Sequence, residues 1–475
     1  MSTEMSSRAH DPSGLGFRSV VSEPMVGAAP AAISQRRARR VRLGELRPRG
    51  REWVLARQGW LGYAGLLFTG ALTALSAART DPLLPASVRP VPSSLAGAFG
   101  HGGINLGFGG MVAVLALMFV SYVAMVRGVH QLTVRPVLIA IACLNLLVLL
   151  APPLLSTDVF SYMAYGRIGA IYGSNPYLYG PSAFTLDPLY PLIGSQWVNT
   201  PTAYGPLFTA LSYVFAPLTV AANVIAYKTI AALSSLVIAF LVWIIARLRD
   251  VSPVKAVAIV GLNPVIVVYG VGGGHNDLLM LAILLTAVYV LLQRKQRTSG
   301  ALIIAAAAVK LTAGLMLPFA LAHGAGERTG PERRRALLVG AGAAAAALGA
   351  FSAAIFGVGT LHLPGTLQGI QSQGGLHSIP GLFLAPFGSK VVYTIAGFVS
   401  DAVLLVWLGV VLRRVWFGKL DWITGAGWGM VALLVTAGWL LPWYVAWLVP
   451  LAALSKDRRL LIVAVALTGL GLTTL

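Results

Sequence analysis

The sequence predicts an all-α polytopic membrane protein. Of its 475 residues, 57% are hydrophobic and only 11% are charged, and the mean hydropathy is +0.78. Soluble proteins carry about 25% charged residues, so this composition excludes an ordinary soluble enzyme and a disordered chain. Many apolar stretches reach the roughly 20 residues that a transmembrane helix needs. The single cysteine, Cys143, lies inside such a stretch, which excludes a disulfide-stapled secreted protein.

Membrane topology explains the net charge of +20. Most Lys and Arg fall in short segments between apolar stretches, at 36–57, 127–135, 247–255, 294–297, 328–335, 413–419 and 456–459. The positive-inside rule places these segments in the cytoplasm. The expected partner is therefore the lipid bilayer of the plasma membrane and not nucleic acid. Residues 1–59 are rich in Ser, Pro, Ala and Arg, and we expect a disordered basic cytoplasmic tail there, not a signal peptide.

The apolar stretches predict about 13 helices in the membrane. They cover 60–78, 109–126, 136–153, 224–246, 254–271, 277–292, 301–310, 311–322, 336–357, 391–412, 422–440, 442–454 and 460–475. Residues 301–322 are too few to cross twice, yet basic loops flank both ends, so we expect two broken half-helices there. Residues 422–454 are likewise short for two full crossings, and we expect a break there around Pro442. Such breaks are tolerated where they line a protein-walled cavity.

Alternation across the membrane predicts three extracytoplasmic segments, at 154–223, 272–277 and 358–390. The first is long and rich in Pro, Gly and Tyr. Two amphipathic stretches within it, 158–171 and 204–219, are expected to be helices that lie at the outer interface.

The 15 acidic residues restrict where chemistry can occur. Most of them lie in the tail or beside basic residues on the predicted cytoplasmic side. The others are Asp81, Asp158, Asp187, Asp277 and Asp401. Asp81 and Asp187 adjoin prolines and are typical of turns. Asp401 lies within a predicted span, where an acid needs a partner or a water-filled cavity.

Asp158 is the first candidate site residue. It follows Thr157, a good helix N-cap, where a span leaves the membrane. On a helix it shares one face with Tyr162 and Tyr165, whereas Arg167 lies on another. An acid with two phenols suits sugar binding. Equally, Asp158 could complement the helix dipole while the tyrosines anchor the interface.

The sequence GGGHND at 272–277 is the second candidate. Its glycines allow close backbone approach to a phosphate, a metal or a sugar. His275 and Asp277 offer two metal ligands, which do not make a metal site, so a divalent metal stays an open question. The same segment suits a flexible loop with a helix cap. Lys310, between two half-helices, fits either a phosphate contact or a snorkelling lysine.

Other polar and aromatic residues suit a hydroxyl-rich ligand. His377 lies among glutamines and glycines of the third outer segment, and Trp443 and Tyr444 follow Pro442. These aromatic residues suit stacking on a sugar and equally suit the aromatic belt of a membrane protein. The sequence contains no P-loop, HExxH or CxxC motif, so ATP-driven transport is unsupported.

Motifs in a fixed order indicate a family. They are TDVFSY at 157–162, YGR at 165–167, NPY at 175–177, GP at 180–181, Trp197, TP at 200–201, YGPL at 204–207, GHND at 274–277, Lys310 and PWY at 442–444. Together they resemble the actinobacterial polyprenol-phosphate-mannose-dependent α-1,6-mannosyltransferases of the GT-C superfamily, which build the mannan core of lipomannan. The similarity covers most of the chain after about residue 60.

The resemblance implies a GT-C fold and catalysis on the extracytoplasmic face. GT-C enzymes carry an essential acid in the large loop after the first core span, between two juxtamembrane helices, and Asp158 matches that general base. The catalytic module would then be 136–475, with its loop at 154–223, and 60–135 would hold two additional helices. The expected partners are polyprenyl-phosphate mannose as donor and a mannoside or lipomannan as acceptor.

We assign the remaining candidates to the two substrates. The donor-binding candidates are Arg167, His275, Asn276, Asp277 and Lys310. The sugar- and acceptor-binding candidates are Tyr162, Tyr165, Trp197, Tyr204, His377, Trp443 and Tyr444. No cofactor is required by the chemistry, because phosphate is a good leaving group and one carboxylate suffices to take the acceptor proton.

Besides a noncatalytic scaffold for envelope assembly, two other functions stay open. One is a GT-C transferase that uses a lipid-phosphate donor of arabinose or glucose. The other is a flippase or transporter of lipid-linked sugars, a class in which broken half-helices are common. A flippase would not need Asp158.

Overall fold

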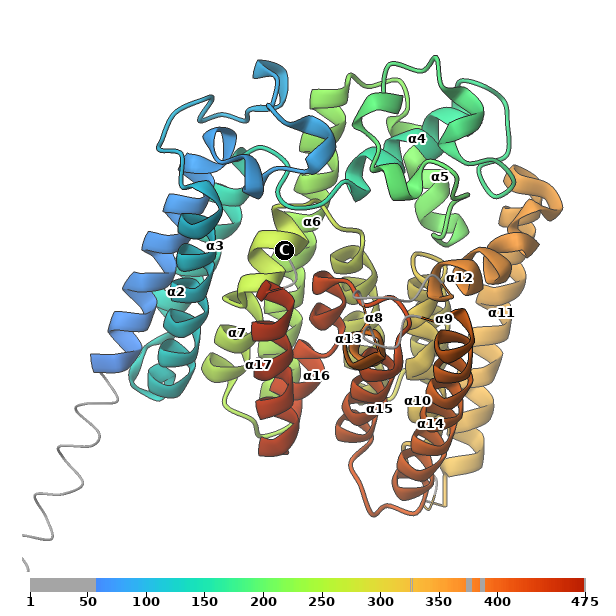
Figure 1. Ribbon diagram of the computed structural model, residues 1–475. Helices are drawn as coiled ribbons and strands as arrows, with labels where there is room; N and C mark the ends of the chain where they lie inside the picture. The colour runs from blue at the N-terminus through green and yellow to red at the C-terminus, as the bar shows by residue number, and fades with distance from the viewer. Residues whose placement is uncertain (1–56, 325, 327, 373–377, 385–388, 474–475) are drawn as a thin grey trace, which may run out of the picture. The chain divides into compact units, whose positions relative to one another are not determined.

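A computed structural model describes residues 57–324, 326, 328–372, 378–384 and 389–473, all within the unit Val54–Leu475 (Figure 1). These residues contain helices and connecting segments and no strand. The first helical span is Arg57–Arg79. The labelled helices are α2 Gly107–Gly128, α3 Val134–Leu150, α4 Asp158–Ala170, α5 Pro206–Phe215, α6 Val220–Leu248, α7 Pro253–Gly261, α8 Asp277–Leu292, α9 Gln296–Ala307, α10 Met316–Ala322, α11 Gly330–Phe356, α12 Leu363–Gln371, α13 Ile379–Leu384, α14 Lys390–Trp416, α15 Trp422–Thr436, α16 Val449–Leu454 and α17 Arg458–Thr473.

Five helical stretches among the described residues are long and apolar enough to cross a membrane. They are Arg57–Arg79, Gly107–Gly128, Val220–Leu248, Gly330–Gln371 and Val391–Trp416. Shorter apolar helices accompany them, including Val134–Leu150, Asp277–Leu292 and Trp422–Thr436. The prediction of an all-α polytopic membrane protein is therefore confirmed. The count of 13 spans stays a prediction, as does the division at residues 59 and 135, and most of the predicted tail lies outside the described residues.

The expected break in 301–322 falls at Lys310. Helix α9 ends at Ala307, the backbone of Lys310 is extended, and a short 3-10 turn, Leu311–Leu315, leads into α10. A helix end leaves carbonyl groups without partners. Here the amides that begin α5 satisfy them, because Leu207 N donates to Ala308 O at 2.9 Å and Gly205 N donates to Val309 O at 3.0 Å.

Gly205 allows this close contact between α5 and the end of α9. A Cβ atom at this position would lie 2.2 Å from the carbonyl oxygen of Ala308. No side chain can occupy that space without moving the backbone. The helix α5 and the turn at Lys310 are thereby fixed to each other.

The break expected around Pro442 is also present. Helix α15 ends at Thr436, and a 3-10 segment, η13 Pro442–Trp447, precedes α16. One expected helix, 254–271, is interrupted: α7 ends at Gly261, and a π-helical segment, η9 Ile266–Val271, follows. Pro264 lacks an amide hydrogen, and the side-chain oxygen of Asn263 accepts from Val265 N and Ile266 N instead.

The two helices expected in the first outer segment are α4 and α5. They pack against each other at one end of the helix bundle, beside a run of 3-10 turns between residues 77 and 95 (Figure 1). Arg249, at the far end of α6 from α5, binds Asp421 through its Nη2 at 2.7 Å, as expected for an acid among basic residues. Asp401 differs from its expected pairing, because it is exposed on α14 and has no hydrogen bond or ion pair with any described residue.

Candidate active site

Four segments that are distant in the sequence bring their polar residues together at the end of the bundle that carries α4. Asp158 is the first residue of α4, and His275 to Asp277 follow the three glycines after η9. Lys310 lies in the turn after α9, and Trp443 to Trp447 lie in η13. Helices α8 and α9 pack side by side and run in opposite directions, so the start of α8 meets the end of α9.

Asp158 is buried, with 5% of its surface exposed, and it has few hydrogen bonds to its carboxylate. Its Oδ2 accepts a long bond of 3.4 Å from the Tyr204 hydroxyl, and its backbone amide donates to the Ser156 hydroxyl. Burial raises the pKa of Asp158 to about 6, with Lys310 opposing that rise and Asp277 adding to it. A carboxylate with a raised pKa and a weakly engaged oxygen is well suited to accept a proton.

Asp277 has a different environment. Its Oδ1 accepts from Lys310 Nζ at 2.7 Å and from Trp447 Nε1 at 2.6 Å. The ammonium group of Lys310 also lies over the rings of Tyr444 and Trp447, 4.6 and 5.2 Å from their centroids. These two rings stack at 4.3 Å. The carboxylate and the aromatic rings therefore hold the ammonium group in one position.

His275 lies close to both carboxylates. Its Nδ1 is 3.6 Å from Asp158 Oδ2 and 4.0 Å from Asp277 Oδ2, and 3.5 Å from the Tyr162 hydroxyl. Burial, together with Lys310, lowers the pKa of His275 well below its usual value, so the imidazole is neutral at physiological pH. Its ring stacks on Trp443 with 3.9 Å between centroids. We infer that His275 acts here as a neutral hydrogen-bonding group.

Several buried polar atoms of this cluster have no hydrogen-bond partner among the described residues. They are His275 Nε2, Asn276 Nδ2, Asp277 Oδ2 and Trp443 Nε1. An unsatisfied buried group costs about 1–3 kcal/mol. Three of the four are nitrogen atoms, and two of these, on Asn276 and Trp443, are donors in every state of the side chain. Such donors suit a ligand rich in hydroxyl or phosphate oxygens.

The predicted sugar-binding aromatic residues line the same region. The rings of Tyr162 and Tyr204 meet edge to face at 4.9 Å, and Tyr165 lies beside Tyr204 and donates to Thr200 O. Trp197 contacts Trp439, which lies shortly before η13. His377 lies outside the described residues.

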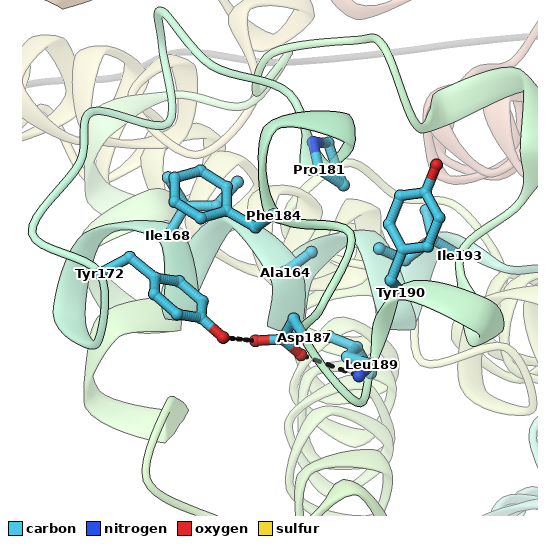
Figure 2. Close-up of a pocket in the computed structure, with 9 residues that line it drawn as sticks. All are labelled: Ala164, Ile168, Tyr172, Pro181, Phe184, Asp187, Leu189, Tyr190 and Ile193. Carbon is cyan, nitrogen blue, oxygen red and sulfur yellow. Dashed lines mark hydrogen bonds between the residues drawn. The ribbon is translucent and has the colours of Figure 1, made fainter.

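Arg167, which we assigned to donor binding, is not part of the cluster. Its Nε binds Asp187 Oδ2 at 2.7 Å, and Tyr172 donates to the same oxygen at 2.6 Å. Figure 2 shows Asp187 bonded to Tyr172 and to the amide of Leu189 at the edge of a small cavity. None of the cluster residues lines that cavity. The structure thus gives Arg167 a role in holding the loop after α4.

Trp447 and Lys228 contact this region although the sequence did not single them out for these roles. Trp447 lies in the same aromatic stretch as Trp443 and Tyr444, which was the available signal. Lys228 is a basic residue inside an apolar span, and that position was the available signal. Within the described residues, no three His, Cys, Asp or Glu side chains are placed to hold a metal ion.

Comparison with known proteins gives two overlapping family matches. Residues 57–326 match the family "Alpha-(1->6)-mannopyranosyltransferase, N-terminal domain", and residues 202–475 match "Glycosyltransferase family 87". The chain is 30% identical to alpha-(1->6)-mannopyranosyltransferase A of Mycobacterium tuberculosis, over 87% of this chain and 82% of that protein.

Shorter matches come from Corynebacterium glutamicum. Its alpha-(1->6)-mannopyranosyltransferase A is 26% identical over 36% of this chain and 35% of that protein. Its alpha-(1->6)-mannopyranosyltransferase B is 27% identical over 27% of this chain and 22% of that protein. No solved structure matches the chain.

Proposed function

The chain belongs to the α-(1→6)-mannopyranosyltransferase family of membrane glycosyltransferases, and from this membership we propose its reaction. It transfers mannose from polyprenyl-phosphate mannose to a mannoside acceptor of the lipomannan type. The reaction takes place on the extracytoplasmic face of the plasma membrane and forms an α-1,6 linkage.

We propose Asp158, and not Asp277, as the general base. The two short hydrogen bonds from Lys310 and Trp447 occupy one oxygen of Asp277. Asp158 accepts a long bond of 3.4 Å from Tyr204, and burial raises its pKa to about 6 although the side chains of Tyr204 and Ser156 act to lower it. A base with a pKa close to the operating pH is both ionised and able to take a proton.

The chemical step then follows from one displacement. The acceptor hydroxyl attacks C1 of the mannosyl group, the C1–O bond to phosphate breaks, and Asp158 takes the hydroxyl proton. The polyprenyl phosphate leaves with the electron pair of the broken bond. A single displacement inverts the anomeric centre, so a β-linked donor gives an α-mannoside.

Lys310 is the proposed partner of the leaving phosphate. Two of the contacts that fix its ammonium group are cation–π contacts, which leave its N–H groups able to donate. One N–H bonds Asp277, and the other N–H groups form no hydrogen bond with a described residue, so we assign them to phosphate oxygens. Asn276 Nδ2 and the neutral imidazole of His275 add donors near the same point. Donors fixed before the reaction stabilise developing charge without reorganisation.

The tyrosines of α4 and its neighbours are the proposed contacts of the sugar rings. Tyr204 is half-buried beside Asp158, and the buried rings of Tyr162 and Tyr165 pack next to it. Tyr444 is half-buried beside Lys310, next to the ring of Trp443. Trp197 contacts Trp439, and we assign this pair to a longer acceptor. Arg167 has no place in this proposal because it is bound to Asp187.

One observation supports the proposal above the others. The buried Asp158 carboxylate and the Asp277 carboxylate, which binds Lys310, both lie close to one atom of His275, because its Nδ1 is 3.6 Å from Asp158 Oδ2 and 4.0 Å from Asp277 Oδ2. This closeness supports Asp158 as the base and Lys310 as the cation of a displacement at a sugar phosphate, with aromatic side chains around them.

The test uses membranes that contain the protein, polyprenyl-phosphate mannose and a short α-1,6-mannoside. We expect transfer by the unmutated protein and a loss of about 100- to 10,000-fold in Asp158→Asn, which is the contribution of a positioned base. Full transfer by Asp158→Asn would refute the assignment of the base. Parallel reactions with polyprenyl-phosphate glucose and arabinose identify the donor sugar, and movement of labelled donor across vesicles without transfer would indicate a flippase.

A further inference from the structure

Lys228 of α6 is completely buried, with 1% of its surface exposed. Its ammonium group donates to the backbone oxygen of Ala151 at 2.5 Å and to that of Pro152 at 3.0 Å. It forms no ion pair with any carboxylate of the described residues. A buried lysine without a counter-charge is uncommon, so these two bonds require an explanation.

The two carbonyl groups lie just beyond the end of α3, whose last residue is Leu150. The C-terminal end of a helix carries partial negative charge and carbonyl groups without partners. Pro152 and Pro153 have no amide hydrogen, so the backbone here has few N–H donors for the carbonyl groups at the end of α3. The Nζ atom of Lys228 supplies the donors that these carbonyl groups lack.

The same two bonds fix the start of a short connection, residues 151–157, which ends at Asp158. Leu154 N donates to Gly272 O at 3.1 Å, and Leu155 N donates to Leu83 O at 2.9 Å. Leu155 has a φ angle of +58°, in the left-handed region that a leucine rarely adopts. Such a conformation persists only where the surroundings determine it. The connection is therefore held in one shape by contacts from three other segments.

Lys228 also contacts the second part of the site. A Cβ atom on Gly274 would lie 3.3 Å from Lys228 Cγ, so the glycine segment packs directly on the lysine stem. His275, Asn276 and Asp277 follow that glycine. The Lys228 side chain thus contacts both the connection that precedes Asp158 and the glycine loop that precedes Asp277.

We propose that Lys228 is a positioning residue that sets the place of the Asp158 carboxylate relative to the His275–Asp277 loop. It acts through residues 151–157 and does not contact the donor phosphate, because two of its three N–H groups bond backbone oxygens in the protein interior. The inference rests on the proposed role of Asp158 as the base.

The test compares Lys228→Met with Lys255→Met, which removes the same charge from an exposed lysine of α7. We expect Lys228→Met to lower kcat about 10- to 100-fold, because a misplacement of about 1 Å costs on the order of 100-fold. The KM for polyprenyl-phosphate mannose should change less than about twofold, as binding of that lipid does not involve Lys228. Lys255→Met should retain activity. A large rise in donor KM with little change in kcat would overturn the proposal in favour of a phosphate contact.

The double variant Asp158→Asn with Lys228→Met separates this inference from the proposed function. If Lys228 acts through Asp158, the second change should cost nothing further, because groups that act as a unit are not additive. Independent losses that multiply would overturn the inference alone. Full activity of Asp158→Asn by itself would overturn the proposed base and this inference together.

A second pair of variants decides the matter if Lys228→Met fails to fold in a thermal-unfolding assay in detergent. Leu155→Val disfavours the left-handed conformation, whereas asparagine tolerates it. We expect Leu155→Val to lower kcat several-fold more than Leu155→Asn, with the donor KM unchanged in both. Equal kcat in the two variants would show that the shape of this connection does not position Asp158.

Discussion

Lys310 Nζ lies 2.7 Å from Asp277 Oδ1, and this bond joins the end of α9 to the start of α8 across 33 residues. Both side chains are largely buried, with 11% and 1% of their surfaces exposed. Loss of one member of such a pair leaves an unpaired charge in the interior, which is more damaging than loss of both. Variants of this pair can therefore distinguish an effect on stability from an effect on catalysis.

The first prediction concerns this pair. Lys310→Gln should lower the stability by about 3 kcal/mol, because the Asp277 carboxylate loses its cation. It should also lower kcat/KM by at least about 100-fold, because the phosphate loses a charged donor. The double variant Lys310→Gln with Asp277→Asn should recover most of the stability but none of the activity. Thermal unfolding in detergent and the transfer assay measure the two effects, and recovery of activity in the double variant would contradict a role of Lys310 in the reaction.

The second prediction concerns pH. The active form of Asp158 is the carboxylate, and its pKa is about 6, so kcat/KM should rise about tenfold per pH unit below 6 and level off above it. The bond from Tyr204 stabilises the carboxylate and lowers this pKa. Tyr204→Phe should therefore move the rising limb to higher pH. Its control is Tyr165→Phe, which removes a hydroxyl that bonds Thr200 O, so the limb should stay in place. A limb that moves to lower pH in Tyr204→Phe would contradict the assignment.

The third prediction concerns Arg167, which lies outside the cluster. Burial alone would raise the pKa of Asp187, but bonds from Tyr172, Leu189 and Arg167 outweigh it and hold the pKa below its usual value. Arg167→Gln should therefore lower the melting temperature by a few degrees, since a partly exposed pair contributes about 1 kcal/mol or less. The donor KM should stay within about twofold of that of the unmutated protein. A tenfold rise in donor KM would show that Arg167 does contribute to donor binding.

Much of the fold follows from the sequence because apolar length and charge are local properties. The breaks at Lys310 and Pro442 could be predicted, since the flanking apolar stretches are too short to cross twice. The interruption at Asn263 was missed because hydropathy does not change there, although the Asn-Pro pair was a usable signal. Helical periodicity already placed Arg167 on a different face of its helix from Asp158. We assigned Arg167 to the donor only because it is positively charged.

Contacts between residues that are distant in the sequence could not be predicted from sequence spacing. Trp447 Nε1 bonds Asp277 across 170 residues, and Lys228 Nζ bonds Ala151 across 77. Neither contact leaves a periodic pattern in the sequence. The partners of a buried polar group depend on how the helices pack, and packing is a property of the whole bundle.

The last prediction concerns the side of the membrane on which the cluster lies. Leu186, in the loop between α4 and α5, has 98% of its surface exposed, and Lys295, between α8 and α9, is also exposed. Cys143 is the single cysteine of the chain, so the variant Cys143→Ser has none and each introduced cysteine can be labelled alone. With a membrane-impermeant maleimide on intact cells, Leu186→Cys should be labelled and Lys295→Cys should not.

Permeabilised cells provide the control, because both cysteines should then react to the same extent. The basic residues Arg294, Lys295 and Arg297 predict that the segment between α8 and α9 stays in the cytoplasm. Asp277 and Lys310 lie at the other ends of α8 and α9, so labelling of Lys295→Cys in intact cells would place the cluster on the cytoplasmic side. The acceptor and the donor sugar would then have to be presented from the cytoplasm, and the proposed reaction on the outer face would be refuted even if Asp158 were the base.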